Sequence, residues 1–364
     1  MTDAAALFPA DVSELTPEIL TASLAARTPG ARIEAFQIAE VKYAGEGVAS
    51  TADRVVLEVE WAQGSPPNLP SRLVLKTMLV GPHALPEMYE TETRFYADIQ
   101  PETEVESPRA FGCHFGGGNG NFGLLMEDLG ERGASFPSAV SEVPAEAIRS
   151  LLGELALLHA TYWESPRFDA ELAWVPTPVA GGMQSIFTQF GYDFAQSQVD
   201  LHPFKQELIA PLGMDVRGLW DRLARVREEH ARRPPTLLHG DTHIGNSFLL
   251  PGNRGGWLDW QLMTRGCFAA DVIYLLVTGL PTEARRRDQE ELLRFYLDAL
   301  GRAGVAHPPG YQETFELCRR AALWGLVIGW LLCPPANYGE AITVENIRRT
   351  VAAVEDLETL AAIG

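Results

Sequence analysis

Apolar residues alternate with polar ones in the first third of the chain, as in half-buried β-strands. Between Val55 and Trp61 every second residue is apolar, which places one face of a strand in a core. The same reasoning predicts strands at 31–41, 54–61, 72–78, 108–111 and 122–126. Helices, each with a proline at its start, are predicted at about 17–27 and 87–100.

Helical spacing replaces this alternation from position 145 onward. Leucines recur three or four residues apart between Leu151 and Leu158. Long helices are expected near 214–231, 283–303, 310–333 and 343–362. Segment 164–213, rich in Gly, Pro, Phe and Gln, is interpreted as an insertion that shapes a substrate site or covers the core. Together the patterns predict an α+β fold with an N-terminal lobe, 1–126, and a larger helical lobe, 127–364.

Composition limits the classes of partner. The chain has 364 residues, of which 46% are hydrophobic, and its formal net charge is −19. Nucleic acids and anionic membranes bind basic patches, so this charge disfavours both as partners. The most apolar stretch, 321–333, is too short to cross a bilayer and is predicted to be a buried helix. The four cysteines have no metal-ligand spacing and no disulfide framework, which favours a reducing cytoplasm.

One short polar string concentrates the candidate chemistry. Residues 239–246 read His-Gly-Asp-Thr-His-Ile-Gly-Asn, so that Asp241 and Asn246 are five residues apart, and Asp259 follows thirteen residues later. Phosphoryl transfer from ATP requires a base that orients the attacking hydroxyl and oxygen ligands that hold magnesium. A hairpin of 247–250 and 256–258 is predicted to return Asp259 to the mouth of the same site.

Taken alone, His-Gly-Asp is a turn and Asp259 a strand-end carboxylate, but the combined spacing favours catalysis. The H-G-D-x-x-x-x-N string and the later Asp-Trp pair resemble the aminoglycoside phosphotransferase and choline kinase superfamily, and look closest to its ecdysteroid-kinase-like, choline/ethanolamine-kinase-like branch. The resemblance implies a bilobal protein-kinase-like fold with ATP and Mg²⁺ as cofactors. It also implies that Asp241 is the catalytic base, and that Asn246 and Asp259 are catalytic metal ligands.

The loop at 42–51 is interpreted as a nucleotide contact. Gly45 and Gly47 would let backbone amides approach the phosphates of ATP closely. Ser50 or Thr51 would donate a hydroxyl to a phosphate, as loops of the resembled superfamily do. Glycines also mark ordinary hairpins, and Ser50 stands where protein kinases carry a third glycine.

Lys76 lies within an apolar strand, where an ammonium group needs a carboxylate or phosphate partner. A water-facing edge strand is the alternative environment. In the resembled fold such a lysine pairs with the α/β-phosphates and is steadied by a glutamate of the next helix. The E-x-x-F-Y string selects Glu92 for that role over its neighbours Glu87 and Glu90.

Two further assignments follow from the resemblance. Segment 124–129 is similar to the hinge of the superfamily, so backbone groups of Glu127 and Leu129 are expected to contact adenine. Asp271 falls where the superfamily carries a structural aspartate, which caps a helix and accepts amides of the catalytic loop. His243 is interpreted as a packing or hydrogen-bonding residue, and the histidine at 159 as a core residue.

The type of acceptor stays open. Only eleven residues separate Asp259 from Asp271, too few for the activation segment by which a protein kinase docks a peptide. We therefore expect a small-molecule acceptor with a hydroxyl group, either an aminoglycoside or a hydrophobic, sterol-like alcohol. Trp324, Trp330 and Tyr338 are candidates for an aromatic wall of its pocket. The alternative is a nucleotide-binding pseudokinase or scaffold without turnover. The oligomeric state is left open.

Overall fold

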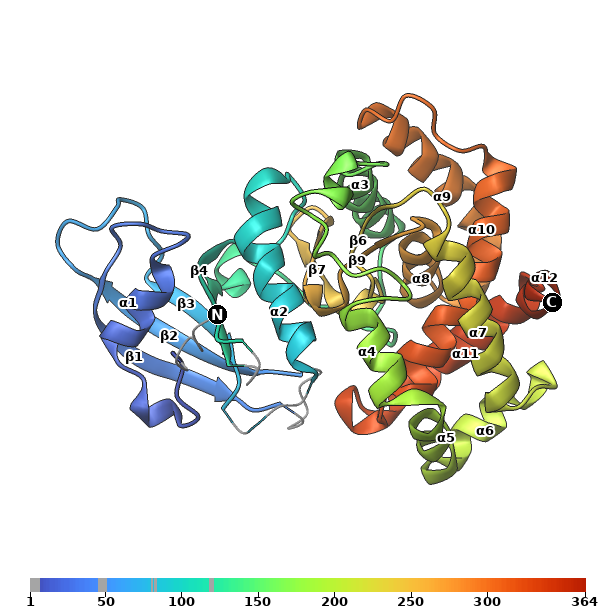
Figure 1. The fold of residues 1–364 in the computed structure, drawn as a ribbon, viewed down its shortest axis with the longest axis horizontal. Coiled ribbons are helices and arrows are strands. Elements are labelled where there is room, and N and C mark those ends of the chain that lie inside the picture. Colours follow the sequence, from blue (N-terminus) through green and yellow to red (C-terminus); the bar gives the residue numbers. More distant parts are fainter. Residues whose placement is uncertain (1–6, 45–50, 80, 82–83, 118–120) are drawn as a thin grey trace. The chain divides into compact units, whose positions relative to one another are not determined.

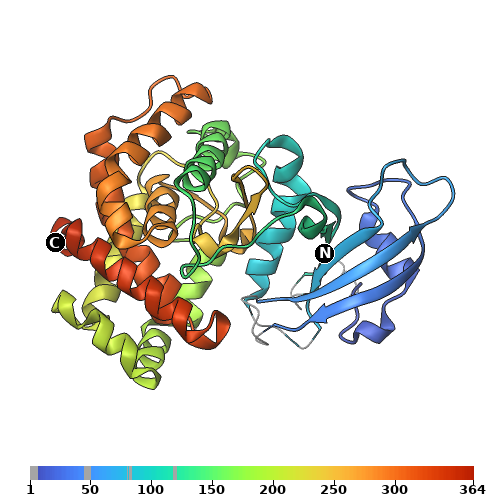
Figure 2. The same ribbon diagram turned by 180° about the vertical axis from the view of Figure 1, so that it is seen from behind.

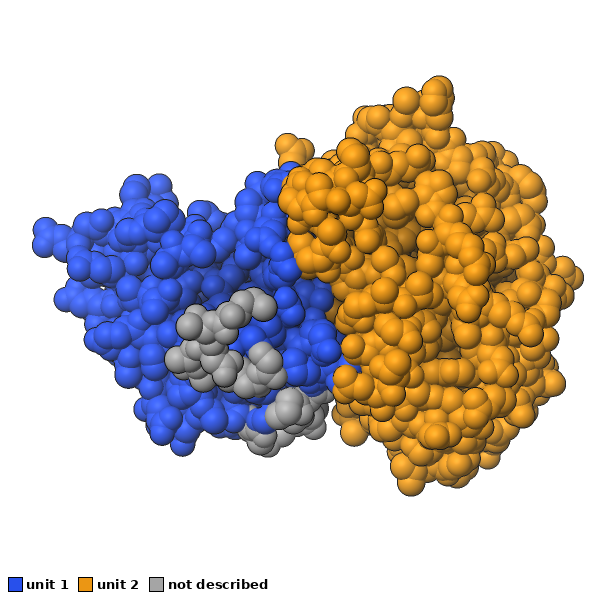
Figure 3. Space-filling view, in the orientation of Figure 1, with its two compact units in different colours: residues 1–102, 107–134 blue, residues 103–106, 135–364 orange. Residues whose placement is uncertain are grey.

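The computed structural model describes the chain except for residues 1–6, 45–50, 80, 82–83 and 118–120. The chain divides into two compact units, which Figure 3 colours separately. Unit 1 comprises Met1–Glu102 and Ser107–Ala134, and unit 2 comprises Thr103–Glu106 and Ser135–Gly364. Unit 1 therefore continues to Ala134, beyond the lobe boundary predicted after Met126.

Within the described part of unit 1, five antiparallel strands form one sheet with the order β1-β2-β3-β5-β4 (Figure 1). The strands are β1 (Ile33–Lys42), β2 (Asp53–Trp61), β3 (Arg72–Thr77), β4 (Ala110–Phe115) and β5 (Phe122–Glu127). Apolar residues of β2 and β3 face a core that helix α1 (Pro17–Leu24) covers. The Thr16 side chain accepts the N–H of Ile19, which explains why α1 begins there.

Several elements of unit 1 differ in extent from their predictions; helix α1, for example, ends at Leu24 and not near 27. Helix α2 (Pro86–Arg94) continues through a π-helical turn, Phe95–Ile99, so the predicted helix has a change of pitch within it. The strand predicted at 108–111 begins two residues later and runs on to Phe115, because its end pairs with the start of β5 across the glycine-rich segment.

Unit 2 is mostly helical (Figures 1 and 2). Its described α-helices are α3 (Ala145–Thr161), α4 (Gly182–Gln189), α5 (Gly191–Leu201), α6 (Pro203–Ile209), α7 (Val216–Ala231), α8 (Ala269–Gly279), α9 (Thr282–Arg302), α10 (Tyr311–Trp324), α11 (Glu340–Asp356) and α12 (Thr359–Ile363). Short strands pair as β6 (Thr236–Leu238) with β9 (Thr264–Gly266), and as β7 (Ser247–Leu250) with β8 (Arg254–Trp257). Helix α10 packs on α7, α8 and α11.

The predicted insertion forms α4 to α6 and is anchored to the C-terminal helices. Helix α5 packs on a π-helix, Gly325–Leu332, that continues α10. In α6 the buried Lys205 ammonium donates to the carbonyl oxygens of Leu331 (2.9 Å) and Cys333 (2.8 Å). Burial lowers the pKa of Lys205 to about 8. This lysine therefore ties the insertion to the end of the π-helix.

The apolar stretch 321–333 lies in the core of unit 2, so its prediction as a buried helix is confirmed. Among the residues that the structure describes, no helix is both long and apolar enough to span a bilayer. The predicted α+β class, with an antiparallel sheet near the N-terminus and helices after it, is also confirmed.

Candidate active site

The candidate catalytic loop, residues 239–246, follows β6 and begins with a turn that requires glycine. Gly240 has a φ of +86°, and a Cβ atom at this position would lie 1.9 Å from the carbonyl oxygen of Leu262. The left-handed backbone and the close approach both exclude a larger residue. The glycine of the His-Gly-Asp string therefore sets the path of the loop.

Asp271 holds the start of this loop in place. Its carboxylate accepts the backbone N–H groups of His239 (2.7 Å) and Gly240 (2.9 Å), and its carbonyl accepts the Thr242 hydroxyl (2.7 Å). The expected bonds from Asp271 to the loop amides are thus confirmed. The expected helix cap is wrong, because Asp271 lies inside the first turn of α8, whose N-cap is Phe268.

His159 supports Asp271 from within the core. Its Nε2 atom lies 3.3 Å from Oδ2 of Asp271, and its Nδ1 atom lies 2.8 Å from the hydroxyl of Tyr296. All three side chains are buried. The interpretation of His159 as a satisfied core histidine is confirmed. Its support of the loop was not predicted, because sequence spacing does not reveal which helices meet behind Asp271.

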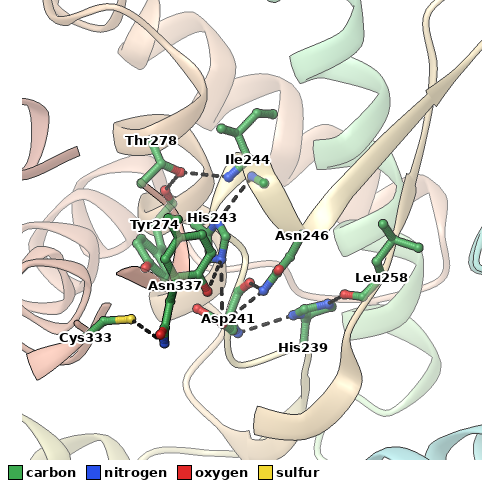
Figure 4. A network of polar contacts seen from close by, with 12 residues as sticks. His239, Asp241, His243, Ile244, Asn246, Leu258, Tyr274, Thr278, Cys333 and Asn337 are labelled. Atoms are coloured by element: carbon green, nitrogen blue, oxygen red, sulfur yellow. Dashed lines mark hydrogen bonds and ion pairs between the residues drawn. The ribbon is translucent and has the colours of Figure 1, made fainter. Parts of the chain in front are cut away.

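Asp241 and Asn246 lie side by side in the loop (Figure 4). The Nδ2 group of Asn246 donates to Oδ2 of Asp241 and to the backbone carbonyl of the same residue, both at 2.9 Å. These two bonds fix the direction of the carboxylate. Because both use the nitrogen, the Oδ1 atom of Asn246 is the end of the carboxamide that can ligate a cation.

His243 lies on another side of the Asp241 carboxylate. Its Nδ1 atom accepts the N–H of Gly245 (3.1 Å), and its Nε2 atom lies 3.8 Å from Oδ2 of Asp241 and 3.4 Å from the Tyr338 hydroxyl. Burial lowers the pKa of His243 to about 3. The imidazole is therefore neutral at physiological pH, and the geometry agrees with the predicted hydrogen-bonding role.

Asp259 reaches the loop through the β7–β8 hairpin, whose prediction is confirmed. The preceding residue, Leu258, donates its N–H to the carbonyl of Asn246 (2.8 Å) and accepts from Nε2 of His239 (2.7 Å). Asp259 itself has left-handed backbone angles, with φ 60° and ψ 77°. Leu258, at the end of the hairpin, is thus hydrogen-bonded to both ends of the loop. The next residue, Asp259, is thereby held beside the loop.

Asp241 and Asp259 bring two carboxyl groups into the same region. Burial, and after it the charge of Asp259, raises the pKa of Asp241 to about 8, although the bond from Asn246 acts in the opposite direction. A divalent cation fits this donor set, because it takes oxygen ligands and offsets the repulsion between carboxylates. In the described ranges no three or more His, Cys, Asp or Glu side chains gather as a metal cluster.

In unit 1, β3 and α2 bring Lys76 and Glu92 together. The Lys76 ammonium donates to both carboxylate oxygens of Glu92, at 2.8 and 2.7 Å, and the two side chains are only 4% and 2% exposed. The structure thus supplies the carboxylate partner that the sequence assigned to Lys76. The alternative environment, a water-facing edge strand, is wrong, because β3 lies between β2 and β5.

Gly45, Gly47 and Ser50 of the predicted glycine loop lie outside the residues that the structure describes. Thr51 is described, and its carbonyl accepts the hydroxyl of Tyr89 at 2.8 Å.

Asp53 was not selected from the sequence. It joins two backbone segments, one just before the predicted glycine loop and one just after β3. Its carboxylate accepts the N–H of Ala44 (2.8 Å) and of Leu79 (2.6 Å), and the side chain is fully buried. A lone aspartate at the start of a strand gave no signal for this function.

Some backbone groups of the two hinge candidates, Glu127 and Leu129, are already hydrogen-bonded within unit 1. The N–H of Glu127 donates to the carbonyl of Arg109 (2.9 Å), and the carbonyl of Leu129 accepts the N–H of Ala134 (3.1 Å). An adenine contact would therefore involve the carbonyl of Glu127 and the N–H of Leu129.

The three aromatic residues predicted to form one wall have different neighbours. Trp330 and Tyr338 lie with ring centroids 5.4 and 5.3 Å from that of His243, next to the candidate catalytic loop. Trp324 instead contacts Phe187 of α4, with a centroid distance of 6.1 Å. Trp324 thus faces the insertion, and the other two face the loop.

Structural neighbours of the chain have low sequence identity. A candidate aminoglycoside phosphotransferase from Ralstonia eutropha JMP134 is 14% identical, with 94% of this chain and 98% of that chain covered and a TM-score of 0.49. An ethanolamine kinase from Plasmodium vivax is 12% identical, with 89% and 81% covered and a TM-score of 0.49. An aminoglycoside phosphotransferase from Streptomyces rimosus, solved with ADP and streptomycin, is 18% identical, with 71% and 87% covered and a TM-score of 0.38.

A search of curated proteins finds no match. A family model, in contrast, matches residues 47–311, which include β2, β3, the loop 239–246 and Asp259. The match covers well over half of the chain, and on this basis the chain belongs to the phosphotransferase enzyme family.

Proposed function

We propose that this protein is an ATP- and Mg²⁺-dependent phosphotransferase that moves the γ-phosphate to a hydroxyl group of a small molecule. The observation that carries the proposal is the arrangement around Asp241. Asn246 fixes its carboxylate, and Asp271 fixes the backbone just before it. Such positioning is the main contribution of a protein to phosphoryl transfer.

Asp241 is the proposed catalytic base. An alcohol barely ionises at neutral pH, so its proton must pass to a nearby acceptor as the bond to phosphorus forms. The carboxylate of Asp241 would orient that hydroxyl and take the proton. The raised pKa of Asp241, about 8, increases its affinity for a proton, and the proposed Mg²⁺ ion beside it would keep the carboxylate ionised before the reaction.

Asn246 and Asp259 are the proposed protein ligands of Mg²⁺. When bound, the ion would offset negative charge on the phosphates, and water and phosphate oxygens would complete its coordination. The Asn246 carboxamide thus has two tasks, since its nitrogen orients Asp241 and its oxygen is available to the ion. The negative charge of Asp259 would also balance part of the positive charge of the ion.

Residues of unit 1 are proposed to bind the nucleotide. Lys76, steadied by Glu92, would pair with phosphate oxygens, because its ammonium has three donors and a fixed position. Gly45, Gly47, Ser50 and Thr51 remain the predicted phosphate loop. The carbonyl of Glu127 and the N–H of Leu129 remain the predicted adenine contacts.

A small-molecule acceptor is favoured by the short segment after Asp259. The segment consists of a 3-10 turn, Trp260–Leu262, and strand β9, which pairs with β6. The segment is therefore paired within unit 2 and offers no long docking segment for a peptide.

The four cysteines are free, which fits the proposed cytoplasmic location.

The test is transfer of labelled phosphate from ATP to a panel of small alcohols and aminoglycosides, with nucleotide binding measured separately. We expect Mg²⁺-dependent product with the wild type and a large loss with Asp241→Asn. Nucleotide binding without any Mg²⁺-dependent transfer or hydrolysis would support a pseudokinase and reject the proposal.

A further inference from the structure

The imidazole of His243 has a fixed direction of hydrogen bonding. Its Nδ1 atom accepts the backbone N–H of Gly245 at 3.1 Å, as the N-cap of a short 3-10 turn, Ile244–Asn246. A neutral imidazole carries one proton, and the nitrogen that accepts a hydrogen bond is the one without it. Burial lowers the pKa of His243 to about 3, so the ring is neutral. The proton of His243 is therefore on Nε2, and this nitrogen is a donor.

The Nε2 atom of His243 donates to the hydroxyl group of Tyr338. The two atoms are 3.4 Å apart, whereas Oδ2 of Asp241 lies 3.8 Å from the same nitrogen, beyond hydrogen-bond distance. Oδ2 instead accepts from Nδ2 of Asn246 at 2.9 Å (Figure 4). Because Nε2 is the donor, the Tyr338 oxygen is the acceptor, and the hydroxyl proton of Tyr338 takes no part in this bond.

The hydroxyl proton of Tyr338 is available to a ligand. Among the described residues, this hydroxyl has no hydrogen bond besides the one from His243. Desolvation, and after it the acidic groups of Cys333 and Asp241, raises the pKa of Tyr338 well above its ordinary value, so the proton stays on the oxygen. The ring is held in place by Trp330 and His243, with centroid distances of 5.2 and 5.3 Å. Unit 2 thus presents a fixed O–H donor beside the proposed base.

Asp241 and Tyr338 flank the same nitrogen of His243, and an acceptor can reach both. The described residues donate to Oδ2 of Asp241 and not to Oδ1, and the side chain is 19% exposed. Tyr338 is also partly exposed. The oxygen of an alcohol carries one proton and two lone pairs. When the proton is directed to Asp241 and one lone pair to Tyr338, the second lone pair is left for the bond to phosphorus.

We infer that Tyr338 binds the acceptor, and that its hydroxyl proton bonds to the oxygen of the alcohol whose own proton passes to Asp241. The inference rests on the proposed phosphotransferase function, because it requires an alcohol at that base. His243 is the positioning residue that makes Tyr338 a donor towards the acceptor. The Tyr338 proton is not transferred. Its contribution is orientation, because the transition state of phosphoryl transfer is loose and a protein acts on it mainly by positioning the reacting atoms.

The first test measures the tautomer of His243 by nitrogen-15 NMR of the full-length protein, with the ring signals assigned through His243→Asn. We expect Nε2 to carry the proton. Tyr338→Phe, which removes only the hydroxyl group, should shift the Nε2 signal and not the Nδ1 signal. A proton on Nδ1 would overturn the inference, because Tyr338 would then donate to His243. An Nε2 signal that does not respond to Tyr338→Phe would also overturn it.

The second test measures phosphate transfer from ATP to benzyl alcohol, glycerol and kanamycin. With the compound that the wild type phosphorylates, Tyr338→Phe should lower kcat/KM for the acceptor about tenfold, as for loss of one hydrogen bond, with ATP affinity unchanged. Tyr274→Phe is the matched control and should behave like the wild type. It also removes a phenol hydroxyl near His243, but that hydroxyl is buried and makes no hydrogen bond among the described residues.

The third test determines whether His243 acts through Tyr338. His243→Asn keeps an oxygen that can cap Gly245, because asparagine is a preferred N-cap residue, and removes the Nε2 donor. We expect this change to lower kcat/KM for the acceptor in the wild type and to cause no further loss in Tyr338→Phe, since members of one hydrogen-bond network are not additive. Losses that multiply would overturn the positioning role of His243.

Failure of the inference and failure of the proposed function give different results. Mg²⁺-dependent transfer that Tyr338→Phe leaves unchanged would overturn the role of Tyr338 but uphold the phosphotransferase. A Tyr338→Phe variant that loses ATP affinity to the same extent as transfer would do the same. Absence of Mg²⁺-dependent transfer by the wild type to any compound would reject the phosphotransferase function and with it the acceptor role, even where His243 has the expected tautomer.

Discussion

Unit 1 and unit 2 each bring together two ionisable side chains near their proposed sites, but the burial and the charge balance of the two pairs differ. In unit 1 the Lys76 ammonium meets both oxygens of the Glu92 carboxylate. In unit 2 Asp241 and Asp259 carry like charges, and the charge of Asp259 contributes to the raised pKa of Asp241. A salt bridge supplies its own compensation, whereas two carboxylates gain most from a cation that comes from solution. The unit 1 pair is therefore complete by itself, whereas the unit 2 pair would be completed by the proposed cation.

The largest expected effect comes from removal of the proton acceptor in the unit 2 pair. Asp241→Asn keeps the shape of the side chain but removes its charge and most of its proton affinity. We expect turnover to fall by roughly 10²–10⁴-fold, the usual share of general acid–base catalysis, with little change in ATP affinity. Single-turnover phosphorylation and separate nucleotide binding are the measurements. A joint collapse of ATP binding would make Asp241 a structural residue.

The second effect concerns the other carboxylate. Asp259→Asn suits the left-handed backbone, because asparagine tolerates positive φ better than most residues. It removes the negative charge that would face the proposed ion, so we expect turnover to fall by roughly 10²–10³-fold, with a higher Mg²⁺ concentration needed for half-maximal rate. A Mg²⁺ titration of the rate checks this, and an unchanged titration would remove Asp259 from the site.

The third effect concerns the compensated pair of unit 1. Lys76→Ala removes the charge that faces the phosphates, and we expect kcat/KM for ATP to fall roughly 10- to 100-fold, as for loss of one charge-assisted hydrogen bond. Glu92→Gln should produce a smaller loss of the same kind. Glu90→Gln is the matched control, because Glu90 lies on the same helix with its side chain 46% exposed. A Glu90→Gln variant as impaired as Glu92→Gln would contradict the pairing.

The smallest expected effect is a change of the free energy of unfolding with pH. It arises from the carboxyl pair of unit 2. The folded-state pKa of Asp241, about 8, lies above the ordinary value of 3.8, so the folded protein holds this proton more tightly than the unfolded chain. Stability from this group is therefore full below pH 3.8 and is lost as the pH rises towards 8. The Asp241→Asn variant has no carboxyl group at this position, so its stability should not fall with pH in this way.

Thermal unfolding in EDTA at pH 5 and pH 8 measures the difference. We expect the melting temperature of Asp241→Asn, relative to the wild type, to rise by a few degrees between the two pH values. Added Mg²⁺ should reduce that rise, because a bound cation favours the ionised carboxylate. A relative melting temperature that stays constant with pH would contradict the raised pKa.

The sequence predicted those features that depend on local order. Alternation located the strands of unit 1, and the fixed spacing of Asp241, Asn246 and Asp259 located the loop and its hairpin. Glu92 was selected by a short string, and the structure pairs it with Lys76. In each case the informative residues are close in the chain or repeat with a regular period.

Features that depend on contacts between distant segments were not predictable in this way. Asp53 connects Ala44 with Leu79, and Arg227 meets Pro178 of the insertion only after the helices have packed. Neither residue belongs to a motif, and an arginine that holds a distant segment looks like any helical arginine in sequence. The π-helical turns were missed for a similar reason, because one extra residue per turn is decided by packing.

The insertion is attached by residues that take no part in phosphate transfer. Lys205 fixes α6 to the end of the π-helix, and Arg227 fixes α7 to the segment that contains Pro178. The candidate catalytic loop is held separately, by Asp271. Substitutions in the insertion can therefore accumulate without disturbing the reaction itself. If the insertion shapes the acceptor site, as the sequence predicts, it is an exchangeable recognition module, through which descendants of one ancestral enzyme could acquire new acceptors by mutation of few positions.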